Sequence, residues 1–209
     1  MNPKELTIEQ VQDILRAERY ICDRSLATVV YLSLVMGKPL LLEGEAGVGK
    51  TEVAKVLSDF QITIPEIGTI AAKHRPYVFL TSNRTREIHD ALKRRCLYHW
   101  IEYPSFEKEH EIITTKFPEV EENMARQICA FMQRVRQMNF YKRPGVAETL
   151  DWASALITLN RRELDDKTVV ETMGCVFKYR EDLHHLRDQV EGRQLNIDQL
   201  LRASPELAS

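Results

Sequence analysis

The sequence predicts an α/β core that is followed by a smaller, all-helical part. An apolar run at 39–42 leads directly into the glycine-rich stretch G-E-A-G-V-G-K-T at 44–51. Two more short apolar runs, 77–81 and 96–103, are typical of strands buried in a parallel sheet. After Pro104 every apolar stretch has helical spacing. We therefore predict two domains, 1–104 and 105–209, with the α/β core first.

Helices are expected before, between and after these strands in the sequence. Thr7 and Gln10 have the spacing of a capping box, and the apolar residues after them predict a helix pair that ends near Gly37. In the second domain, Trp152, Leu156 and Leu159 are expected to form a core stripe. The remaining elements are expected as a helix at 52–57, a hairpin at 61–70, a short helix at 86–94, and helices at 107–116, 120–138, 147–160 and 167–186.

The stretch 44–51 matches the phosphate-binding pattern G-x-x-x-x-G-K-[ST], between a strand and a helix as that pattern requires. Its backbone N–H groups and the helix N-terminus would surround a phosphate. Lys50 would reach the β- and γ-phosphates, and the Thr51 hydroxyl would bind Mg²⁺. The predicted ligands are therefore ATP and Mg²⁺, held by Gly44, Glu45, Ala46, Gly47, Val48, Gly49, Lys50 and Thr51. The alternative is a glycine-rich turn before an ordinary helix. It does not explain why both the preceding strand and the following helix match the context of the phosphate-binding pattern.

Composition narrows the class of protein. The 209 residues are 44% hydrophobic and 29% charged, with a net charge of −2, as in an ordinary globular protein. This charge and the lack of a basic stripe with aromatic residues disfavour nucleic acid as a partner. The longest apolar stretch, 26–36, is too short to span a membrane. The four cysteines are scattered without a C-x-x-C pair, so we expect free thiols and a cytoplasmic location.

Three segments, 40–55, 80–104 and 144–153, resemble the MoxR branch of the AAA+ ATPases in sequence and in order. The resemblance implies a P-loop NTPase core of parallel strands with a small all-α lid. It also implies a homo-oligomeric ring that uses ATP hydrolysis for chaperone-like remodelling or maturation of client complexes. Such proteins typically work with a partner that carries a von Willebrand factor A domain. Some relatives mature metalloenzymes, for example molybdenum-containing carbon monoxide dehydrogenases.

The resemblance also assigns candidate catalytic residues besides Lys50. Asn83 matches the sensor 1 position, which orients the attacking water; a cap on the following helix is its alternative role. Arg95 matches the arginine finger that serves a neighbouring subunit's ATP, with Arg94 as the second choice. Both arginines are otherwise solvated charges before a strand. At the sensor 2 position this chain has Glu148, and Arg143 is the nearest basic residue. The hairpin at 61–70 would contact the ring pore or a client, or belong to the core.

One family motif has no counterpart here. No apolar run ends in the Asp-Glu pair (Walker B) that holds Mg²⁺ and polarises water. The 25 residues between Thr51 and Tyr77 are too few for two crossover units. In the family's strand order, 5-1-4-3-2, strands 2 and 3 are therefore absent, and a reduced sheet of strands 5, 1 and 4 remains with an apolar edge. Either the natural protein has a segment that this sequence lacks, or the gene carries an internal deletion.

Three functions stay open on sequence grounds. The first is a MoxR-type ATPase. The second is a nucleotide-binding but hydrolysis-deficient regulatory or truncated subunit, which the missing acidic pair favours. The third is a helical interaction module whose nucleotide site is vestigial.

Overall fold

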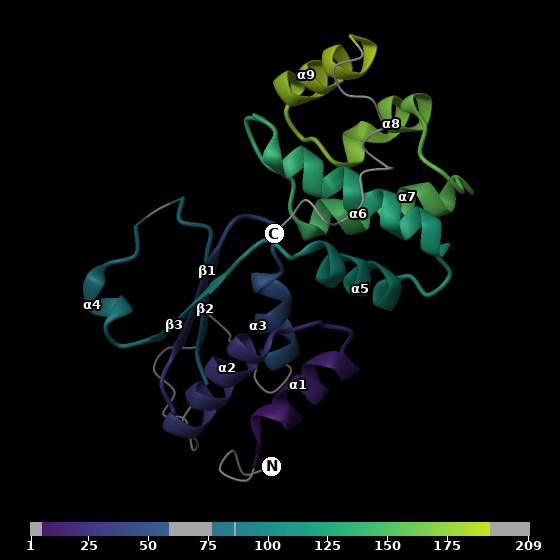
Figure 1. Ribbon diagram of the computed structural model, residues 1–209. Coiled ribbons are helices and arrows are strands. Elements are labelled where there is room, and N and C mark those ends of the chain that lie inside the picture. Colours follow the sequence, from purple (N-terminus) through teal and green to yellow (C-terminus); the bar gives the residue numbers. More distant parts are fainter. Residues whose placement is uncertain (1–5, 59–76, 86, 193–209) are drawn as a thin grey trace, which may run out of the picture. The chain divides into compact units, whose positions relative to one another are not determined.

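The computed structural model describes residues 6–58, 77–85 and 87–192 (Figure 1). The chain forms two compact units, Met1–Glu102 and Tyr103–Ser209, which divide close to the predicted boundary. The hairpin expected at 61–70 lies outside the described residues. Among the helices within the described residues, none is both long enough and apolar enough for a membrane crossing.

The first unit is an α/β fold with a small parallel sheet. Its strands are β1 (Leu40–Gly44), β2 (Phe79–Ser82) and β3 (Leu97–Ile101), in the order β2-β1-β3. Both neighbours run parallel to β1, with Leu40 opposite Phe79 on one side and Leu97 on the other. Every residue of the central strand is buried, which explains its uninterrupted apolar run. The expected sheet of three contiguous strands, with the first in the middle, is confirmed.

The longer helices of this unit are two that contact the sheet and one that packs on the first of them. The first pair, α1 (Ile8–Ala17) and α2 (Arg24–Met36), pack on each other, and α2 and α3 (Lys50–Ser58) contact the sheet. The capping box of α1 forms as expected, with Gln10 N donating to Thr7 Oγ1 at 3.2 Å and Thr7 N to Gln10 Oε1 at 2.9 Å. Gly37 ends α2 in the left-handed conformation (φ 59°), where a residue without Cβ is favoured.

The helix expected at 86–94 is shorter than predicted. It is limited to α4 (Asp90–Lys93), a single turn. His89 sets its start, because the ring Nδ1 accepts a hydrogen bond from Ala91 N at 3.2 Å.

The second unit is all-helical. Its elements are α5 (Phe106–Lys116), α6 (Glu122–Gln137), α7 (Val146–Thr158), α8 (Asp166–Thr172), the 3-10 turn η2 (Met173–Cys175) and α9 (Arg180–Glu191). The single helix predicted at 167–186 is wrong: it is divided into α8, η2 and α9. Gly174 disfavours continuation of a helix, and Val176 and Phe177, each 2% exposed, direct their side chains into the core. Helical periodicity alone cannot reveal such a break.

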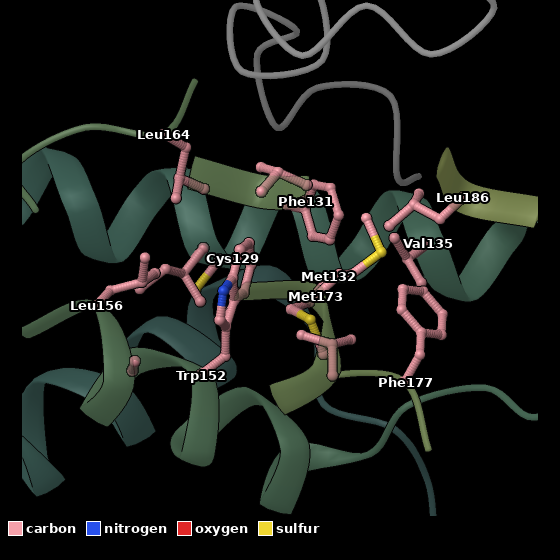
Figure 2. Close-up of a cluster of buried hydrophobic side chains, with 14 of the residues drawn as sticks. Cys129, Phe131, Met132, Val135, Trp152, Leu156, Leu164, Met173, Phe177 and Leu186 are labelled. Carbon is pink, nitrogen blue, oxygen red and sulfur yellow. The ribbon is translucent and has the colours of Figure 1, made fainter. Parts of the chain in front are cut away.

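The core of this unit centres on Trp152 and Phe131, whose ring centroids lie 4.8 Å apart (Figure 2). Trp152 is fully buried and its indole N–H donates to Thr172 Oγ1 at 2.7 Å, so the polar atom of the ring is satisfied. Cys129 lies in the same cluster with no exposed surface. Leu159 is 53% exposed, so its predicted place in the core stripe is wrong; it follows the last turn of α7.

A buried ion pair joins α5 to α6. The Arg136 guanidinium donates to both oxygens of the Glu109 carboxylate, each at 2.6 Å, and Glu109 has no exposed surface. Gln133 Nε2 and Thr149 Oγ1 donate to the same carboxylate at 2.9 and 2.7 Å. Each oxygen therefore accepts two hydrogen bonds, which satisfies the buried charge.

Candidate functional site

The candidate site is the loop between β1 and α3. The strand ends at Gly44 and the helix begins at Lys50. A Cβ on Gly44 would lie 2.5 Å from the carbonyl oxygen of Ile101 and 3.1 Å from Val48 Cγ2, so β3 leaves no room for a side chain. Gly47 and Gly49 have φ angles of 77° and 94°, which L side chains rarely adopt. The glycines of the motif are thus required by this backbone path.

Lys50 is held inside the loop that precedes it. Its ammonium donates to the carbonyl oxygen of Gly44 at 2.8 Å and to that of Glu45. Only 5% of the residue is exposed, and this burial lowers the pKa of Lys50, while the charge of Glu45 opposes the shift. A buried cation held mainly by carbonyl dipoles is a favourable partner for an anion. The donor set of this loop therefore fits the phosphates of a nucleotide.

The other predicted ligand residues lie along the same turn. Val48 is buried and anchors the loop, Ala46 is half-buried, and Glu45 is exposed. Thr51 lies in the first turn of α3 and is exposed, so its hydroxyl is accessible at the helix N-terminus. Residues 44–51 thus form one continuous connection from the end of β1 into the first turn of α3.

Asn83 lies at the same end of the sheet as the loop, where the strands end. It directly follows β2, whose last residue, Ser82, is opposite Glu43. Because the strands are parallel, Asn83 comes level with Gly44 at their carboxyl ends. Its alternative role as a cap on the next helix is wrong, since His89 caps α4. Asn83 is exposed.

Arg95 lies at the opposite end of the sheet, where the strands begin. It precedes β3, and the start of that strand, Leu97, is opposite Leu40, while its end, Ile101, is opposite Gly44. The strand between these ends is on the order of 13 Å long. Arg95 and its alternative, Arg94, are both exposed. Within one chain, the structure does not bring either arginine to the loop that holds Lys50.

The two sensor 2 candidates lie in the helical unit. Glu148 Oε2 accepts a hydrogen bond from Gly145 N at 2.9 Å, so this carboxylate caps α7. Arg143 is exposed on the connection between α6 and α7. The capping contact explains why a glutamate suits this position without any role for it in nucleotide binding.

Two residues near the loop escape sequence reasoning. Strand β1 extends through Glu43, and only 4% of this residue is exposed. Tyr98 Oη donates to Glu43 Oε2 at 3.2 Å; burial and the Glu43 charge raise the pKa of Tyr98. Tyr20 lies against Gly49, where a Cβ would come within 3.4 Å of its ring, and burial raises the pKa of this phenol. The strand length identifies Glu43, but no sequence pattern marks Tyr20.

Comparisons with known proteins do not add to this picture. No model of a protein family matches the chain, and no curated protein matches it. Among the described residues, no group of three or more His, Cys, Asp or Glu side chains is arranged to hold a metal ion. The geometry of the loop is therefore the main guide to function.

Proposed function

We propose that the protein is an AAA+ ATPase of the MoxR type that binds Mg·ATP at residues 44–51 and uses hydrolysis to remodel or mature client complexes. The observation that carries the proposal is the buried Lys50 ammonium within a loop whose conformation requires glycine. The small parallel sheet supports it, because the loop follows the central strand, as in P-loop folds.

Each candidate residue has a role that its position allows. Lys50 and the loop's N–H groups bind phosphate oxygens, and the Thr51 hydroxyl completes a Mg²⁺ site at the start of α3. Asn83, level with the loop at the carboxyl edge, orients the attacking water. Arg95 lies at the end of its own sheet that is away from the loop. We therefore assign it to the ATP of a neighbouring subunit in a homo-oligomeric ring. A bound magnesium ion would neutralise the negative charge that develops on the transferred phosphoryl group.

A second candidate function is nucleotide binding without hydrolysis, as a regulatory or truncated subunit. The absence of an Asp-Glu pair after an apolar run favours it. Beside the loop, the buried acid is Glu43, whose carboxylate bonds to Tyr98. Loss of a catalytic acid or base typically lowers turnover about 10²- to 10⁴-fold.

Equilibrium binding of Mg·ATP and phosphate release from it test both candidates. Lys50→Ala removes charged hydrogen bonds worth about 1.5–3 kcal/mol, so we expect affinity to fall about 10- to 150-fold. Lys55→Ala is the matched control, because it removes the same charge from the same helix at an exposed position. Turnover above the Lys50→Ala level supports the ATPase; binding without turnover supports the second candidate. If neither ATP nor ADP binds at millimolar concentration, the nucleotide site is vestigial and the helical unit is an interaction module.

The assembly and its partners are tested separately. We expect Mg·ATP to promote a homo-oligomeric ring, which sedimentation velocity measures with and without nucleotide. The proposed partner is a protein with a von Willebrand factor A domain, and the proposed client is a protein or metalloenzyme complex. A chain that stays monomeric at saturating nucleotide would contradict the ring and the role of Arg95 in it.

A further inference from the structure

Two connecting segments of the helical unit meet through two aromatic pairs. One segment lies between α6 and α7 and the other between η2 and α9. Phe140 and Phe177 form the inner pair, with ring centroids 4.6 Å apart and exposures of 8% and 2%. Tyr141 and Tyr179 form the outer pair, 5.0 Å apart, with exposures of 79% and 38%. The inner pair belongs to the core, whereas the outer rings remain at the surface.

The first of these segments is held by hydrogen bonds to its backbone. The buried Asp182 carboxylate accepts from Tyr141 N at 2.7 Å and from Lys142 N at 3.2 Å. The carbonyl oxygens of the next two residues accept from Tyr103 Oη at 3.4 Å and from Arg136 Nε at 2.9 Å. The Tyr141 ring is therefore presented from a fixed backbone, which reduces the entropy lost when a ligand stacks on it.

Cationic side chains lie close to the two rings in the sequence, and one of them contacts a ring. Lys142 Nζ lies 5.9 Å from the centre of the Tyr179 ring. Lys178 Nζ donates to two carbonyl oxygens at the end of η2, at 3.3 and 2.8 Å, which holds its charge near the surface. Arg143 is exposed on the first segment, and Arg180 is the exposed first residue of α9. This positive charge is local, because the whole chain has a net charge of −2.

We propose that this aromatic-basic patch, formed by Tyr141, Lys142, Arg143, Lys178 and Tyr179, binds single-stranded nucleic acid. Exposed base faces would stack on the tyrosine rings, and phosphates would lie against the cations. An acidic peptide would use the cations but would gain little from two exposed rings. A duplex hides its base faces. The sequence shows no basic stripe, since the two halves of the patch are far apart along the chain and only the fold joins them.

Fluorescence anisotropy of a labelled oligothymidylate tests the stacking contribution. The full chain is titrated at low salt with excess Mg·ATP, which occupies any phosphate site in the loop at 44–51. Tyr141→Ala should weaken binding about 5- to 150-fold, the range for loss of one base–aromatic stack. Tyr141→Phe keeps the ring and should bind as the unchanged protein does. Because Tyr141 is 79% exposed, both variants should fold normally.

The charge contribution has a matched control. Lys142→Gln with Arg143→Gln removes two charges from the patch, and Arg162→Gln with Lys167→Gln removes two from another exposed surface of the same unit, where the side chains are 84% and 77% exposed. The patch variant should reduce the slope of log K against log salt by about 1.4, and the control should leave it nearly unchanged.

Three results would overturn the proposal. The first is no binding of the oligonucleotide at low salt. The second is equal weakening by the patch and control double variants, which would indicate general charge attraction. The third is unchanged binding by Tyr141→Ala together with displacement of the oligonucleotide by polyglutamate, which would identify an acidic-peptide surface.

Discussion

Replacing Glu109 by glutamine should destabilise the helical unit strongly although it changes only one atom. This carboxylate accepts four hydrogen bonds: two from Arg136, one from Gln133 and one from Thr149. A glutamine turns one acceptor oxygen into an NH₂ donor. In either orientation of the amide, that group faces an N–H of Arg136, which cannot accept a hydrogen bond.

The expected magnitude follows from burial. The Glu109 and Arg136 side chains are 0% and 5% exposed, so the variant leaves a guanidinium charge buried without its counter-charge. Such changes cost about 3–5 kcal/mol. For a unit of roughly 100 residues, each kcal/mol lowers Tm by about 4–5 °C, so we expect a decrease of about 12–25 °C.

Tryptophan fluorescence during thermal unfolding measures this loss. The chain has two tryptophans, one in each unit, so a Trp100→Phe background leaves Trp152 to report on the helical unit alone. Glu122→Gln is the matched control, since it makes the same change in an exposed pair whose Arg126 Nε lies 2.7 Å away. Exposed pairs contribute about 0–1 kcal/mol. Equal Tm shifts in the two variants would refute the argument from burial.

Three shorter predictions concern other positions. Asp165→Ala removes the N-cap of α8 and should cost about 0.5–2 kcal/mol near neutral pH; because hydrogen bonds from Thr168 lower the pKa of Asp165, this difference should disappear as pH falls below about 4 in urea-unfolding titrations. Gly44→Ala places a Cβ against the Ile101 carbonyl and should destabilise the sheet unit by about 1–3 kcal/mol, measured by denaturant unfolding. If the chain hydrolyses ATP with Glu43 as its base, Glu43→Gln should lower kcat about 10²- to 10⁴-fold with unchanged ATP affinity, and an unchanged kcat would exclude Glu43 from the reaction.

The strands of the first unit and the loop after β1 could be predicted because each depends on residues that are neighbours in the sequence. The apolar runs gave the three strands, and the glycines and Lys50 gave the turn between β1 and α3, since the required φ angles and the short connection are properties of neighbouring residues. The break after α8 was missed, because the inward direction of Val176 and Phe177 depends on a core formed by distant helices.

The same distinction applies to the candidate site. Residues 44–51 and Asn83 could be placed from the motif and from the polarity of parallel strands. Tyr20 could not, because its position against Gly49 depends on how α1 and α2 pack. The tyrosine pair on the helical unit was equally hidden, since Tyr141 and Tyr179 meet only after the helices assemble.

The burial of Cys129 gives the protein an internal reporter of its own opening. Cys22, Cys96 and Cys175 are half-buried, whereas Cys129 has no exposed surface, and desolvation raises the pKa of its thiol. Thiol reagents attack the thiolate, so Cys129 should be labelled only when the helical unit opens. Labelling of the fourth thiol in native buffer, followed by mass spectrometry over time, would thus measure the opening equilibrium of that unit without any denaturant.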